Sequence, residues 1–99
     1  MIDNRPESAR VAADGRLLSA GARLTALNTR AGGAIGTPFA VPPLATLAHL
    51  AATLRMPVSR LVIAADGERD IELMVKAVPE GDVVVLEAGG WTLRAPRSS

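Results

Sequence analysis

The chain has 99 residues, of which 48% are hydrophobic and 21% charged, and its formal net charge is +1. These values suit a single folded domain and exclude a disordered chain. Without cysteine there is no disulfide, thiolate metal site or cysteine nucleophile, and the dispersed basic residues with few aromatics argue against nucleic-acid binding.

The N-terminal residues predict a β-hairpin. Residues 1–8 are polar and include Pro6, so we expect a flexible or capping segment there. Asp14-Gly15 is one of the strongest hairpin dipeptides, and apolar residues lie on both sides of it. Two short strands joined by a tight turn are therefore expected.

A first helix is predicted to follow the hairpin. Ser19 is its expected N-cap, because a serine hydroxyl can accept a hydrogen bond from a free amide of the first turn. One face of this helix is apolar at helical spacing: Ala20, Leu24, Leu27 and Ala31. Gly32-Gly33 should end the helix, and an irregular connector with Phe39 as its aromatic anchor should follow.

The rest of the chain predicts a second helix and three strands. Pro42 and Pro43 are suited to a helix start, and this helix is expected from Leu44 to Arg55. Its apolar face is formed by Leu44, Leu47, Leu50, Ala51 and Leu54. Three runs rich in β-branched residues predict antiparallel strands over 58–65, 71–78 and 83–88, and Gly89-Gly90 should break the last one.

This element order predicts an α+β domain in which helices pack on one face of a five-stranded antiparallel sheet. The domain is expected over residues 9–94, with residues 95–99 as an exit linker. Residues 83–86, Val-Val-Val-Leu, put apolar groups on both faces of the last strand. The face turned away from the helices therefore needs a cover, and self-association would provide one.

Several short motifs resemble PAS domains. Residues 13–20, Ala-Asp-Gly-Arg-Leu-Leu-Ser-Ala, resemble the first hairpin of that family, and residues 22–27 look like the helix that follows it. Residues 35–39, Ile-Gly-Thr-Pro-Phe, look like the apolar-Gly-x-Pro-apolar segment that is frequent after the second PAS helix. The resemblance implies a PAS-like fold in which the helix over 44–55 crosses the sheet and the final three strands form its long antiparallel half.

The resemblance extends to the end of the last strand. Thr92 and Arg94 align with the Asp-x-Thr-x-Arg type signature of many PAS domains, whereas its acidic residue has no counterpart here. In the family that acidic residue helps to couple the domain to its output. The resemblance therefore implies a domain whose coupling to its output departs from the common pattern.

The resemblance also implies a function, that of a sensory and dimerisation module at the N-terminus of a bacterial sensor histidine kinase in a two-component system. The sequence contains no kinase motif, so the chain itself is not expected to be an enzyme. The implied partners are a second copy, a downstream kinase or other output domain, and a small apolar ligand. The candidate pocket lining is Leu24, Leu27, Phe39, Leu47, Leu50 and Leu54. Candidate dimer or signal-exit contacts are Trp91, Thr92 and Arg94, with Trp91 as a cap on the core as the alternative.

The sequence offers no catalytic, cofactor or metal site. His49 is the only histidine and lies roughly 160° from the apolar stripe of its helix, which argues against a haem ligand. Asp66, Glu68 and Asp70 crowd one turn but lack the remaining ligands of a calcium loop, so a solvated turn is expected. The glycines near residue 33 follow a helix, whereas a phosphate-binding loop precedes one.

A second class of function stays open, that of a stand-alone adaptor or dimerisation protein with a roadblock-like sheet-and-helix fold. The first ten residues are polar, unlike a secretion signal, and no apolar run reaches the about 18 residues that span a bilayer. A cytoplasmic location without membrane insertion is therefore expected.

Overall fold

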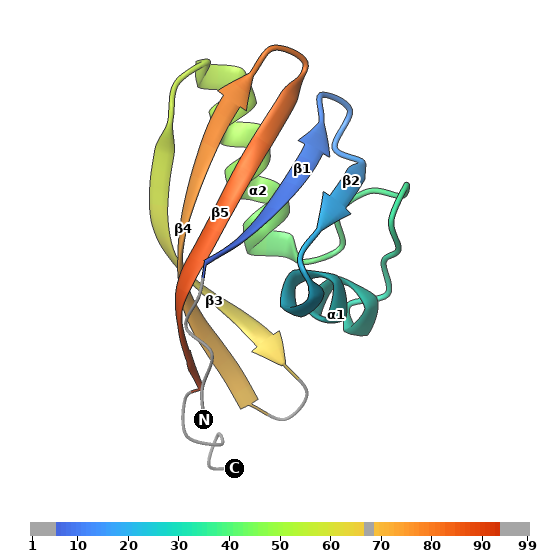
Figure 1. Ribbon diagram of the computed structural model, residues 1–99, viewed down its shortest axis with the longest axis vertical. Helices are drawn as coiled ribbons and strands as arrows, with labels where there is room; N and C mark the ends of the chain where they lie inside the picture. The colour runs from blue at the N-terminus through green and yellow to red at the C-terminus, as the bar shows by residue number, and fades with distance from the viewer. Residues whose placement is uncertain (1–5, 67–68, 94–99) are drawn as a thin grey trace.

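The chain folds as two short strands, two helices and three long strands, in that order (Figure 1). The computed structural model describes residues 6–66 and 69–93. The strands are β1 (Glu7–Ala12), β2 (Leu17–Ala20), β3 (Val58–Asp66), β4 (Arg69–Glu80) and β5 (Val83–Leu93). The helices are α1 (Ala22–Arg30) and α2 (Pro42–Leu54).

The five strands form one antiparallel sheet in the order β2-β1-β5-β4-β3. The last strand in the sequence, β5, is thus the central strand of the sheet. The long helix α2 contacts β3, β4 and β5, and α1 contacts β1 and β3 (Figure 1). The predicted α+β class and the five-stranded antiparallel sheet are confirmed.

The core lies between the helices and one face of the sheet. In β4, Ile71, Leu73, Val75 and Ala77 are buried, as the alternation in the sequence predicts. Between them, Met74 and Lys76 are exposed. Because successive side chains of a strand point to opposite faces, one face of β4 carries the core and the other faces away from the helices.

The hairpin turns at Asp14-Gly15, as predicted, and the connector after α1 returns to it. β1 begins at Glu7, so the strand takes in the last two residues of the expected terminal segment. The Leu17 amide donates to the Thr37 carbonyl at 2.9 Å, and the Gly36 amide donates to the Leu17 carbonyl at 2.7 Å. An edge strand presents backbone groups that need partners, and the connector provides some of them along β2.

Two predictions about the helices are wrong. Ser19 does not cap α1, because β2 continues through Ser19 and Gly21 takes the N-cap position. Leu54 has the expected angular position on α2, yet its side chain is 51% exposed. It lies in the last turn before Arg55 closes the helix in the left-handed conformation, with φ 56°, and the core does not extend over that turn.

The prediction that Gly89-Gly90 breaks the last strand is also wrong. β4 pairs with β5 at Met74↔Gly89 and again at Glu72↔Thr92, so β5 contains one residue more than β4 between these two pairs. Gly90 has φ +64°, which glycine adopts without steric cost, and the extra residue forms a β-bulge. Val84, Leu86 and Ala88 are buried on the helix side, and a strict period of two would send Trp91 to the opposite face. The bulge turns Trp91 inward, where it is only 4% exposed.

The two ends of α2 should respond differently to the same substitution. Leu44 is fully buried, so Leu44→Ala should lower the free energy of unfolding by about 2–5 kcal/mol. Leu54→Ala should lower it by less than about 1 kcal/mol, because half of that side chain is already in water. Chemical denaturation of the two variants measures the difference, and equal losses would contradict this account of the core.

Candidate functional site

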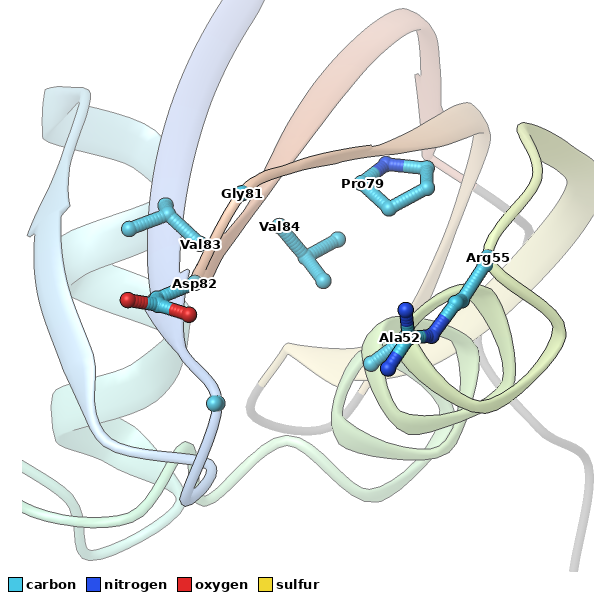
Figure 2. A pocket seen from close by; sticks show the side chains of 8 residues that line it. Ala52, Arg55, Pro79, Gly81, Asp82, Val83 and Val84 are labelled. Atoms are coloured by element: carbon cyan, nitrogen blue, oxygen red, sulfur yellow. The ribbon is translucent and has the colours of Figure 1, made fainter.

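A groove opens where α2 ends and β4 turns into β5 (Figure 2). Its volume is about 500 Å³. Figure 2 shows the Arg55 side chain, from the end of α2, and Asp82, from the β4–β5 turn, on opposite sides of this space, with Val84 between them. The groove therefore has an apolar wall between two oppositely charged residues.

The groove continues toward the β1–β2 hairpin as a second space of about 260 Å³. The two spaces share Ala13, Ala52 and Val84, and we call them together the α2 groove. Ala45, Ala48 and Ala52 line it along α2. Because an alanine side chain stops at Cβ, these positions leave room between the helix and the strands that larger side chains would fill.

The charged and polar groups of the α2 groove lie at its rim. The Arg16 amide donates to Asp14 Oδ1 at 3.1 Å, and Arg16 Nε donates to Asp14 Oδ2 at 2.7 Å. The backbone hydrogen bond, with the guanidinium beside it, lowers the pKa of Asp14 below its usual 3.8. His49 is exposed and also lines the groove, so its side chain points away from the core, as its helical position predicts.

Most residues predicted to line a pocket belong to the packed core. Leu24, Leu27, Phe39 and Leu47 are buried, Leu50 is partly buried and packed against them, and Leu54 is exposed. Leu47 and Leu50 also border an open space of about 300 Å³ between α2 and β3. The α2 groove itself is lined by other residues, most of them alanine, valine or turn residues, which a search for large apolar side chains misses.

A second cluster lies near the end of β5. The Arg23 guanidinium, on α1, lies over the Trp91 ring at 5.4 Å from its centroid. Trp91 Nε1 is buried, and among the described residues it has no hydrogen-bond partner. The ring thus packs inside the domain, as the core-cap interpretation expects. Thr92 is exposed and donates to the Gly90 carbonyl at 3.2 Å, and Arg94 lies outside the described residues.

Glu7 connects the N-terminal strand to the same helix. Its Oε1 accepts hydrogen bonds from the Arg23 and Leu24 amides at 3.0 and 3.1 Å, and its Oε2 accepts from the Arg23 amide at 3.1 Å. These are free amides of the first turn of α1, where a negative charge is also favoured by the helix dipole. We call Glu7, Arg23 and Trp91 the exit cluster. It joins β1, α1 and β5.

Glu7 fits only because residue 21 is a glycine. A Cβ at Gly21 would lie 2.6 Å from Glu7 Oε1, although the backbone there, with φ −64°, suits any residue. Glu7 lies two residues before the buried Ala9 on β1, so its side chain points to the same face of the sheet as Ala9. This spacing is the sequence signal that could have placed Glu7 next to α1. The capping residue is therefore distant in the sequence from the helix that it caps.

Asn28 is a further residue that the sequence analysis did not single out. It is fully buried on α1, and its Oδ1 accepts a hydrogen bond from the Ala40 amide at 2.7 Å. This bond ties the end of α1 to the connector before α2. Its spacing of four residues from Leu24 is the signal that could have placed it on the buried face.

The described residues show neither a metal cluster nor a membrane helix. No group of three or more His, Asp or Glu side chains within residues 6–66 and 69–93 could hold a metal ion. In the same part of the chain, no helix is long and apolar enough to cross a membrane. Glu68 of the acidic turn and the side chain of Asp66 lie outside what the structure describes.

Gly21→Ala tests the cap of α1. The added methyl group should displace the Glu7 carboxylate from the two amides and lower the free energy of unfolding by about 1 kcal/mol. In a Glu7→Ala background the same substitution should cost less, because the carboxylate clash is gone and only the 3.0 Å contact with the Cβ of residue 7 remains. Chemical denaturation of the wild type, both single variants and the double variant gives the coupling, and strictly additive losses would contradict it.

Arg23→Met tests the contact with Trp91. Loss of the cation–π contact should lower the free energy of unfolding by about 0.5–1 kcal/mol and change the fluorescence of Trp91. The chain has one tryptophan and no tyrosine, so the emission reports this ring alone. Arg10→Met, at an exposed site on β1, is the control, and equal effects on the emission would contradict the assignment.

Comparison with known proteins adds no family to this geometry. No protein-family model matches the chain, and a search of the curated proteins also finds no match. The fold, the α2 groove and the exit cluster are therefore the evidence on function.

Proposed function

We propose that this chain is a PAS-like sensory and dimerisation module that regulates a signalling output, with a histidine kinase as that output. The proposal is supported by the element order, in which a short hairpin and two helices precede three long antiparallel strands. This is the order that the PAS resemblance of residues 13–20 and 35–39 implies. The chain acts as a cytoplasmic regulatory domain rather than as the enzyme.

One observation carries the proposal: the central strand β5 connects the two candidate sites. Val83 and Val84, at its start, line the α2 groove, and Trp91, near its end, packs under Arg23. β5 pairs with β1 on one side and with β4 on the other, so its position depends on both neighbours. A change in the packing of α2 against Val84 therefore has a direct structural route to the exit cluster.

The proposed mechanism is a shift between two packings of α2 on the sheet. A small apolar ligand or a partner side chain in the α2 groove would favour one packing by contacting Ala52 and Val84. The contact between Trp91 and Arg23 would then tighten or loosen, and the strand end would pass this change to the output. A ligand shifts such an equilibrium only by its difference in affinity for the two packings.

Ala52→Leu tests this function in a fusion of the whole chain to the catalytic core of a histidine kinase. The larger side chain should occupy part of the α2 groove and change autophosphorylation several-fold, because it mimics a bound apolar group. Ala26→Leu, on the exposed face of α1, is the matched control and should leave the activity unchanged. Native mass spectrometry of the unfused chain should show a dimer and any retained small molecule.

The outcomes separate the two classes of function. A monomeric chain, together with a fused kinase that Ala52→Leu does not affect, would overturn the proposal. A dimer whose fused kinase is equally indifferent to Ala52→Leu and Ala26→Leu would favour the roadblock-like adaptor instead. Circular dichroism of both variants shows whether a loss of activity reflects unfolding.

A further inference from the structure

The face of the sheet turned away from the helices carries exposed apolar side chains. Leu61 and Ile63 of β3 are 56% and 43% exposed, and Met74 of β4 is 53% exposed. Leu61 and Met74 are directly paired across the two strands. Together these three residues form an apolar strip across the outer face, which we call the outer strip.

Two opposite charges flank the outer strip on β4. Glu72 and Lys76 lie two residues before and two residues after Met74, so the period of two puts all three side chains on the outer face. Glu72 is paired with Ile63, and Lys76 with Ser59 on β3 and Glu87 on β5. Met74 therefore lies midway between a negative side chain, Glu72, and a positive one, Lys76.

We propose that the outer face, centred on Met74, is the contact between two copies of this chain. A two-fold axis that passes by Met74 and runs across the strands would bring the two β4 strands face to face and antiparallel. Glu72 of each copy would then meet Lys76 of the other, and Met74 and Leu61 would meet their own equivalents. This contact names the surface used by the dimer in the proposed function, and it rests on that function.

The charges select this axis over the other simple one. A two-fold axis along β4 would make the strands parallel and bring Glu72 onto Glu72 and Lys76 onto Lys76. Like charges that face each other disfavour a contact, so the axis across the strands is preferred. The opposite charges at equal spacing on either side of Met74 make this surface complementary to a second copy of itself. An unrelated partner would not require that symmetry.

Charge reversal on one side tests the contact. Lys76→Glu alone and Glu72→Lys alone should each raise the dissociation constant of the dimer roughly ten-fold or more, because two attractive contacts become repulsive. An equimolar mixture of the two variants should form a heterodimer about as stable as the wild-type dimer, since every 72–76 contact again joins opposite charges. Sedimentation and native mass spectrometry at low salt measure both effects.

The mixing experiment also separates repulsion between the two copies from repulsion within one copy. Glu87 is paired with Lys76, so Lys76→Glu creates a repulsion inside one copy as well. That repulsion is still present in the mixture, so recovery of the heterodimer reports the contact between copies alone. Met74→Glu should also abolish the dimer, whereas Leu54→Glu, at a matched exposure of 51% on α2, should not.

The wild-type mass distinguishes this inference from the proposed function. If the wild type is a dimer and each charge variant alone, or Met74→Glu, dimerises as tightly as the wild type, the dimer uses another surface, such as the edge of β3. The outer-face contact is then overturned while the proposed function stands. If the wild type is monomeric at every concentration, the dimerising part of the proposed function fails as well. Loss of the dimer in each charge variant alone, together with a stable heterodimer in their mixture, supports the contact.

Discussion

The direction of the Trp91 side chain depends on one extra residue in the central strand. Without the bulge at Gly90, the alternation of β5 would place Trp91 on the outer face of the sheet. With it, the ring enters the space beside α1 and lies under Arg23, whose amide is held by Glu7 of β1. A glycine with positive φ therefore determines how β1, α1 and β5 meet at this end of the domain.

The two ends of the domain are packed differently. At the exit cluster, a guanidinium lies over a large ring, and a carboxylate caps the helix that carries this guanidinium. At the α2 groove, alanines on α2 face strand residues across open space, and Arg55 closes the helix in a conformation that glycine or asparagine adopts more readily. The core between them is built from tightly buried leucines and valines, so the groove is where a ligand would require the least rearrangement.

The outer face differs from both ends because, among residues 6–66 and 69–93, no side chain covers the outer strip, whose three members are 43–56% exposed. On this face, Glu72 and Lys76 lie at the two-residue spacing of a strand. The backbone of β4 therefore sets where each side chain starts relative to Met74. The α2 groove, the exit cluster and the outer strip lie at different places on the domain, and each includes a residue of β4 or β5. In the proposed function, an input, an output and a partner would therefore use different surfaces of one sheet.

The sequence alone determined the class of fold, because hydrophobic periodicity and turn dipeptides are local signals. The alternation of residues 71–77, the turn at Asp14-Gly15 and the helix end at Gly32-Gly33 all appear as predicted. Tertiary structure decided the rest. The carboxylate that caps α1 comes from β1, the bulge that orients Trp91 is defined by its pairing with β4, and the α2 groove exists because alanines meet distant strands. Each of these depends on contacts between residues far apart in the chain, which local patterns do not encode.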